Sequence, residues 1–366
     1  MNMRIALMRT VNFLRRGITP AGLLCIMTGL LGCVAVYNAT FHLAHPFRYV
    51  TRQFVWLFPA FLTLIITAGA SAARHKSIGV VVAVGLYAAL WGVLVLGVRV
   101  NGMRGWFAWH GIFVQPSELG KPAFVLLLAG LITSLRQRNY DIKREFLVLL
   151  AFLAAWVLPI SLQPDFGTML VYIFAFAATY ICAGGRVRYL AGAGAAALPF
   201  GFISFWLNPY LTDRFLAFLR PAEYAHSAAW HIQQFQLTLA SGGLFGRSWG
   251  EGVQTQNYLP LGYSDSVFAT LGEAIGFLGV LPFIVLILAY VLYVYRAIQR
   301  AADGLHATVM LGAVFILVGQ AFLHLSVNLG IFPPTGLPLP LISYGGSSLV
   351  ATLALIGLVE SMSRTD

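Results

Sequence analysis

Long apolar stretches, each close to the roughly 20 residues that cross a bilayer as a helix, recur along this 366-residue chain and limit what it can fold into. Only 10% of its residues are charged and 59% are hydrophobic, whereas soluble domains carry roughly 25% charged residues. The 27 Phe, 15 Tyr and 8 Trp residues exclude a disordered chain. The sequence therefore predicts an all-α integral membrane protein, with residues 1–366 forming a single membrane domain.

Hydropathy defines ten candidate membrane-spanning helices. They cover residues 19–38, 53–71, 77–98, 117–135, 146–162, 167–184, 188–206, 266–295, 306–328 and 346–362. Basic residues precede the first of them, but no clear small-residue cleavage site follows it. We therefore expect a retained helix rather than a cleaved signal peptide.

The basic residues predict how these helices are oriented. With the N-terminus in the cytoplasm, 15 of the 23 Lys and Arg residues fall in short segments on that side, as the positive-inside rule requires. An even number of spans then places the C-terminus in the cytoplasm as well. The net charge of +11 is accounted for mainly by orientation, so nucleic-acid binding is not predicted.

Three longer connections face outward in this orientation. They cover residues 99–116, 207–265 and 329–345. The longest one joins the seventh and eighth helices, and it places Trp230, Ile232, Phe235 and Leu239 near helical spacing. This pattern predicts an interfacial helix that lies along the membrane surface, and a surface helix packed on the loop's own core explains it equally well.

Ionisable residues at or inside the spans are few, and charge is costly there. Glu118 and Lys121 lie three positions apart at the start of a helix, so they can pair; helix capping is the structural alternative. Asp165 and Asp265 each precede a helix, so each can be either an N-cap or a functional carboxylate. Glu273, about two helical turns after Asp265, is interpreted as a buried polar contact.

The surroundings of Asp265 favour a functional interpretation. The loop that ends there carries the basic residues Arg214, Arg220, His226, His231 and Arg247. Arginine side chains bind phosphate groups in bidentate fashion. The chain has no Gly-rich phosphate loop followed by Lys-Ser/Thr, so ATP-driven transport has no support within it.

Five ordered motifs resemble those of the SEDS family, which contains RodA, FtsW and SpoVE. They are QPSELGK at 115–121, QPDFGT at 163–168, SGGLFG at 241–246, LP and SD within 259–265, and PTGLPLPLISYGGSS at 334–348. The resemblance covers nearly the whole chain. It implies a ten-helix glycosyltransferase of the bacterial cytoplasmic membrane that polymerises lipid II into glycan strands at the outer face. It also implies a class B penicillin-binding protein as transpeptidase partner, together with other elongation or division proteins.

The resemblance assigns roles to individual positions. The family's essential aspartate falls on Asp265, and its QPSE glutamate and lysine fall on Glu118 and Lys121. The QPD aspartate falls on Asp165. The family commonly has His-Thr-Asp-Phe where this chain has Tyr-Ser-Asp-Ser at 263–266. In the last motif GLPLP is more similar to RodA than to FtsW, which favours a role in elongation over division.

These roles lead to a mechanistic hypothesis in which Asp265 is the general base. It takes the proton from the acceptor's 4-hydroxyl as that oxygen attacks the donor's anomeric carbon and undecaprenyl pyrophosphate leaves. The candidate substrate-binding residues are Glu118, Lys121, Asp165, Arg52, Arg214, Arg220, Arg247 and His231. A divalent cation, Mg²⁺ or Mn²⁺, is compatible with this chemistry, although no protein metal site is visible in the sequence.

Two other functions stay open at this point. A transporter that flips lipid II has equal use for buried polar groups and ten helices, but it should spread them along a full membrane path. The candidates here cluster at the outer rim. A non-catalytic scaffold for the penicillin-binding protein is the third possibility, and it predicts that replacing Asp265 has no effect.

Overall fold

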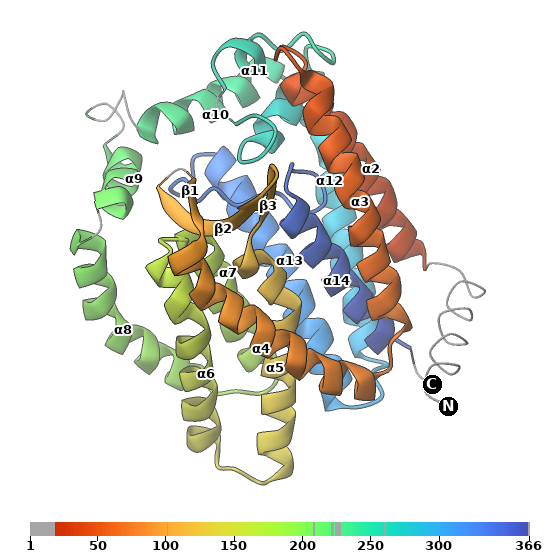
Figure 1. The fold of residues 1–366 in the computed structure, drawn as a ribbon, viewed down its shortest axis with the longest axis vertical. Coiled ribbons are helices and arrows are strands. Elements are labelled where there is room, and N and C mark those ends of the chain that lie inside the picture. The colour runs from red at the N-terminus through yellow and green to blue at the C-terminus, as the bar shows by residue number, and fades with distance from the viewer. Residues whose placement is uncertain are drawn as a thin grey trace.

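The computed structural model describes residues 19–100, 102–207, 209–220, 223, 228–259 and 261–364. Its helices and strands follow one another as α2 (Pro20–Thr40), α3 (Pro46–Gly69), α4 (Ala72–Leu96), β1 (Val98–Val100), β2 (Met103–Trp109), β3 (Ile112–Val114), α5 (Pro116–Gln137), α6 (Ile142–Leu162), α7 (Phe166–Cys182), α8 (Val187–Leu207), α9 (Pro209–Leu219), α10 (Ala228–Gly242), α11 (Val253–Asn257), α12 (Val267–Ile298), α13 (Gly304–Asn328) and α14 (Gly346–Met362). Figure 1 shows a helical bundle in which α10 and α11 lie across one end and α9 lies at the flank, next to α10.

Local sequence explains where several helices begin. Proline occupies the first turn of α2, α3 and α5, where its missing N–H costs no hydrogen bond. The Asp141 carboxylate accepts from the amide of Lys143 at 2.8 Å and thereby caps α6. Asp303 caps α13 in the same way, through the amide of His306 at 2.9 Å.

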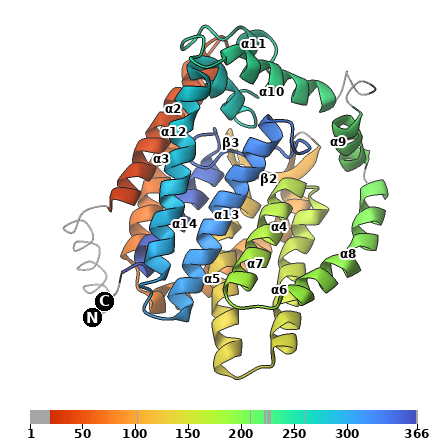
Figure 2. The same ribbon diagram turned by 180° about the vertical axis from the view of Figure 1, so that it is seen from behind.

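A helix lies at each of the ten predicted stretches, which confirms a polytopic helical membrane protein. Within the described residues, six helices have the length and hydropathy of a membrane span, and three further apolar helices are shorter. The count of ten spans stays a prediction. The central helices are α13 and α14: 67% of the apolar window of α13 is buried, against 17% for α12 at the periphery. Figures 1 and 2 show α13 and α14 between α3, α5 and α7.

The two ends of the described bundle meet. The Thr19 hydroxyl, at the N-cap of α2, donates to Glu360 in the last turn of α14 at 2.6 Å. Both ends therefore lie on the same side of the bundle, as an even number of spans requires. Which side faces the cytoplasm rests on the distribution of basic residues.

A small sheet forms in the connection between α4 and α5, where the sequence predicted no regular structure. Its three strands are antiparallel in the order β1, β2, β3. His110 and Gly111 form the tight turn between β2 and β3 with φ angles of 45° and 79°. Two residues with positive φ are what a two-residue hairpin turn with the twist of a β-sheet requires.

The long loop contains the predicted helix, α10. Phe235 and Leu239 of this helix pack with Ala269 of α12 and Val327 of α13. The loop is therefore packed on the helical bundle, not on a core of its own. Whether α10 also lies along the membrane surface stays a prediction.

The helix predicted at 266–295 is α12, and it contains an interruption that hydropathy did not predict. Gly276 interrupts α12 with φ 70° and ψ 179°. The backbone of residues 243–248 bonds to the interrupted turn, for example from the amide of Phe277 to the carbonyl of Gly243 at 2.9 Å. The SGGLFG motif thus satisfies the polar groups that the interruption frees.

Replacing Gly276 by alanine is expected to destabilise the protein by at least about 2 kcal/mol. A Cβ atom at Gly276 would overlap the amide nitrogen of Gly246, and the φ of 70° at this position disfavours any L side chain. Gly130→Ala is the matched control, because no atom beyond the neighbouring turns of its own helix lies within 4 Å of the added carbon there. Denaturant unfolding in detergent measures both variants; equal stability of the two would contradict the role of Gly276.

Candidate active site

The segment that carries Asp265 is held by hydrogen bonds to three consecutive carbonyls. The carbonyls of residues 263–265 accept, in order, from the amide of Tyr344 at 2.8 Å, the hydroxyl of Ser343 at 2.7 Å and the side-chain amide of Asn328 at 3.0 Å. Buried backbone groups need such partners. The last motif of the chain and the end of α13 therefore fix the backbone at Asp265.

Polar residues recur every fourth position along α13 and bind the neighbouring loop. Gln320 donates to the carbonyl of Pro338 at 2.8 Å, and His324 donates from Nδ1 to the carbonyl of Leu337 at 2.8 Å. Asn328 completes the row, because its Oδ1 also accepts from the amide of Ala269 at 3.2 Å. The loop 334–343 and the first turn of α12 are thereby tied to one helix.

Asp265 itself is not the cap of α12, because Ser266 occupies the N-cap position. The residue is half-buried, and burial raises the pKa of its carboxyl above the ordinary value of aspartate. The Ser264 hydroxyl and the positive charge of Arg214 hold back part of this rise. A carboxylate of raised pKa is a stronger base, which suits proton abstraction.

Arg214 and His231 reach the same region from α9 and α10. Arg214 donates to the carbonyl of Pro334 at 2.9 Å, and a Cβ atom at Gly336 would lie 3.6 Å from Oδ2 of Asp265. Burial, and then the nearby charge of Arg214, lower the pKa of His231, which favours its neutral form. The loop segment 334–336 therefore lies between a carboxylate and a guanidinium.

Glu118 and Lys121 form a buried ion pair, with 2% and 1% of their side chains exposed. Lys121 also donates to Gln320 Oε1 at 2.7 Å. Because Gln320 in turn holds Pro338, the pair is connected to the loop beside Asp265. The predicted pairing is confirmed, and both side chains are directed into the protein.

Asp165 is the N-cap of α7. Its Oδ1 accepts from the amide of Thr168 at 3.2 Å, and its Oδ2 accepts from Gln115 at 2.9 Å and from Ser117 at 3.0 Å. Only 3% of Asp165 is exposed. Asp165 therefore acts as a helix cap, one of the two interpretations that the sequence allowed. Its bonds to Gln115 and Ser117 also join the start of α7 to the start of α5.

A comparison with protein families shows the family of this chain. The model of the cell cycle proteins FtsW, RodA and SpoVE matches residues 20–366. The chain belongs to the SEDS family.

Relatives and solved structures agree with this assignment. The chain is 30% identical over 354 residues to the probable peptidoglycan glycosyltransferase FtsW of Geobacter metallireducens, covering 93% of both chains. It is 34% identical to the putative FtsW of Cyanophora paradoxa, over 70% of this chain and 64% of that protein. The rod shape determining protein RodA of Thermus thermophilus has the same fold, with a TM-score of 0.69, 27% identity and coverage of 94% and 95%. A chain of a peptidoglycan synthase complex gives a TM-score of 0.75 at 28% identity, covering 94% and 96%.

These relatives do not decide whether the chain is more similar to RodA or to FtsW. The sequence relatives named above are called FtsW, whereas the Thermus structure is a RodA. The assignment to elongation, which rests on the GLPLP sequence at 336–340, stays a prediction.

The other basic residues predicted to bind substrate lie in different contacts. Arg220 is 65% exposed and pairs with Glu223 at 3.4 Å. Arg247 donates to the carbonyl of Ser241 at 2.8 Å, beside the interrupted turn of α12. Arg52 lies next to the β2–β3 turn, where its Nη2 would be 3.0 Å from a Cβ atom at Gly111. The structure thus brings Asp265, Arg214 and His231 together. The arginines at 220, 247 and 52 lie elsewhere in the protein.

Glu273 is a buried polar contact, as predicted. Its carboxylate accepts from the Ser241 hydroxyl at 2.9 Å and from the amides of Gln254 and Thr255 at 3.0 and 2.8 Å. It therefore joins the SGGLFG segment to the start of α11. This is a structural role in the long loop.

Several residues of the site were not predicted. The row of Gln320, His324 and Asn328 has a recognisable signal, because polar side chains at four-residue intervals mark one face of an otherwise apolar helix. The aromatic cluster of Tyr49, Tyr263 and Tyr344, with ring centroids 4.7 to 5.7 Å apart, has no such signal. Its members come from three distant segments.

The described residues contain no group of three or more His, Cys, Asp or Glu side chains that could hold a metal ion. The donor set beside Asp265 consists of one carboxylate next to a guanidinium, which does not fit a metal site built by the protein. No catalytic step is therefore assigned to a protein-held metal.

Proposed function

We propose that this chain is a peptidoglycan glycosyltransferase that joins lipid-linked disaccharide units, such as lipid II, into glycan strands. The support is its membership of the SEDS family together with relatives that carry this activity in their names. The observation that carries the chemistry is the half-buried Asp265, which has a fixed backbone and a carboxyl under the positive charge of Arg214.

Asp265 is the general base in this proposal. Polymerisation needs one group that accepts the proton of the attacking sugar hydroxyl. The bonds to the carbonyls of residues 263–265 hold the backbone of the base, and the residue as a whole is only half-buried. Preorganisation of this kind avoids rearrangement during the reaction.

Arg214 is the cation best placed to stabilise the negative charge of the leaving pyrophosphate. Its charge acts on both Asp265 and His231, and its bond to Pro334 ties it to the loop beside the base. Developing negative charge is stabilised by fixed positive groups. A divalent cation would have to be bound mainly by the pyrophosphate, since the described residues contain no metal cluster.

The proposal also places the site at the outer face of the cytoplasmic membrane. The positive-inside rule supports this orientation, and the three outward connections contain the Asp265 site and its supporting loops. A class B penicillin-binding protein is the proposed partner, because the matched synthase complex couples polymerisation to crosslinking. Proteins of the elongation or division machinery are proposed as further partners.

The test is to mix the purified full chain with lipid II in detergent, with and without its partner, and to look for glycan chains. Detergent removes any need for transport across a bilayer. Polymer that depends on Asp265 supports the enzyme. A wild-type chain that makes no polymer with its partner present contradicts it, and translocation of lipid II in vesicles would then support the transporter.

Replacing Arg214 by glutamine is expected to move the acid limb of the pH–rate profile to higher pH. The positive charge lowers the pKa of the Asp265 carboxyl, so its removal lets that pKa rise further. The base is then protonated, and activity lost, at a higher pH than in the wild type. The measurement is the initial polymerisation rate across the acidic range. Arg220→Gln is the control, because that exposed arginine pairs with Glu223; an unchanged limb in Arg214→Gln would contradict the electrostatic coupling.

A further inference from the structure

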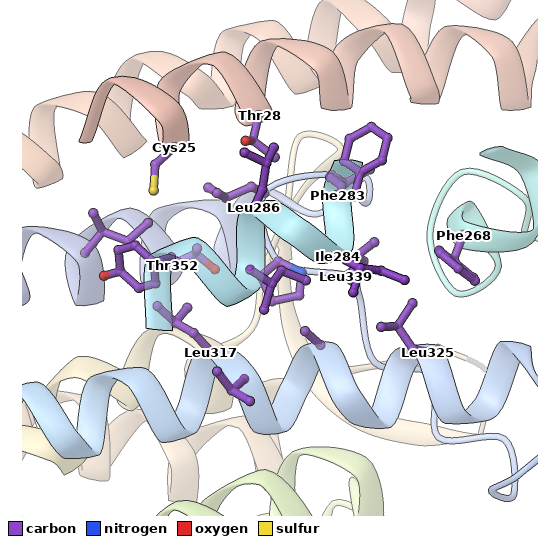
Figure 3. A pocket seen from close by; sticks show the side chains of 18 residues that line it. Cys25, Thr28, Phe268, Phe283, Ile284, Leu286, Leu317, Leu325, Leu339 and Thr352 are labelled. Atoms are coloured by element: carbon purple, nitrogen blue, oxygen red, sulfur yellow. The ribbon is translucent and has the colours of Figure 1, made fainter. Parts of the chain in front are cut away.

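An apolar pocket lies between α2, α12, α13 and α14, beside the loop that approaches Asp265 (Figure 3). Its lining contains no charged residue, and its hydroxyl-bearing members are Thr28, Tyr290 and Thr352. Figure 3 places Phe268 and Leu325 at one end, and Cys25 and Thr352 at the other. The pocket therefore extends from the first turn of α12 deep into the bundle.

The surface around this pocket has the character of a lipid-facing wall. Large apolar side chains are exposed on three of the four bordering helices: Met27 55%, Leu30 45% and Leu31 46% on α2, Val285 59% and Leu288 56% on α12, and Phe322 64% on α13. Exposed apolar faces on membrane-spanning helices contact hydrocarbon chains. A pocket between such faces is accessible to a hydrocarbon chain from the bilayer.

The pocket and the candidate active site share two chain segments. Phe268, which lines the pocket, comes three residues after Asp265 in the first turn of α12. Residues 339–342 line the pocket as well, and the next residue, Ser343, donates to the carbonyl of Ser264. A chain lying in the pocket would thus have its outer end beside the segment that carries the proposed base.

We propose that this pocket binds the polyprenyl chain of the lipid-linked substrate. The inference rests on the proposed function, and it names where the hydrocarbon part of that substrate lies. The cavity volume is about 90 Å³. A membrane-spanning helix of a partner occupies a cylinder of roughly 2,400–3,400 Å³, so a linear chain is the better match. Burial of its methylene and methyl groups supplies the affinity.

Photo-crosslinking to the full chain in detergent tests the proposal without requiring polymerisation. The probe is geranylgeranyl phosphate with a diazirine at the far end of its chain. Labelling is expected on pocket residues of α2, α12 and α13, and undecaprenyl phosphate should suppress it. Labels spread over the exposed helix faces, or suppressed equally by phosphatidylglycerol, would show that the pocket holds ordinary membrane lipid.

A pair of adjacent substitutions sharpens this test. Ala321 lines the pocket and is 4% exposed, whereas its neighbour Phe322 is 64% exposed. Ala321→Trp should fill the pocket and lower labelling by at least about tenfold, and Phe322→Trp should leave labelling unchanged. Equal labelling of the two variants overturns the proposal. The map on the wild-type chain stands as evidence even where Ala321→Trp does not fold.

The result of the labelling experiment can be distinguished from the result of the polymerisation test of the proposed function. A wild-type chain that is labelled in the pocket but forms no glycan refutes the polymerase and retains the polyprenyl site. A chain that forms glycan but is not labelled in the pocket refutes the site alone.

Discussion

Replacing Asp265 by asparagine is expected to lower the rate of glycan polymerisation by roughly 10²- to 10⁴-fold, the contribution typical of a positioned general base. Asparagine has nearly the same shape but cannot accept the proton of the attacking hydroxyl. The bonds that fix residues 263–265 are made by backbone carbonyls, so the substitution leaves them in place. The measurement is the initial rate of chain formation from lipid II in detergent.

Asp213→Asn provides the matched control for this experiment. It makes the same chemical change in the outer region, at an exposed position one residue before Arg214. Its rate is expected to stay within about twofold of the wild type, as for surface substitutions that alter stability little. Substantial polymerisation by pure Asp265→Asn would remove Asp265 as the base, and a silent substitution together with intact partner binding would favour the scaffold.

Hydropathy was sufficient to predict the long apolar helices of the bundle, because each needs a long apolar stretch that is visible locally. The short helices α9 and α11 of the long loop were not predicted. The interruption of α12 at Gly276 could not be predicted from hydropathy. It depends on contact between α12 and residues 243–248, which are separated from it by the whole of α11. The strands between α4 and α5 were missed for a related reason, since β1 and β3 each contain three residues and give no clear alternation.

The candidate site was predicted in part. The importance of Asp265 came from family resemblance, and the structure adds the bonds that hold it. Arginines at 214, 220 and 247 were indistinguishable in sequence, because membership in one loop says nothing about where each side chain packs. Only Arg214 acts on Asp265 in the structure, whereas Arg220 is on the surface and Arg247 supports the interrupted turn.

Replacing Lys121 by methionine is expected to destabilise the protein by about 3–5 kcal/mol, the cost of leaving a buried charge without its partner. Glu118 is 2% exposed and would lose its cation. Gln320 would lose a donor at 2.7 Å, which loosens the row of α13 contacts that holds Pro338. The free energy of unfolding in detergent measures the effect, and the double variant with Glu118→Gln should recover much of the loss.

Arg220→Met is the matched control, because it breaks an ion pair with the same three-residue spacing whose side chains are 65% and 62% exposed. Its effect is expected to stay below about 1 kcal/mol, since exposed pairs are screened by solvent. The comparison also decides between the two roles of Lys121. Lost stability in Lys121→Met, recovered in the double variant, identifies a structural pair that supports the loop beside Asp265. Unchanged stability with a raised KM for lipid II would instead mean that Lys121 leaves Glu118 to contact the substrate.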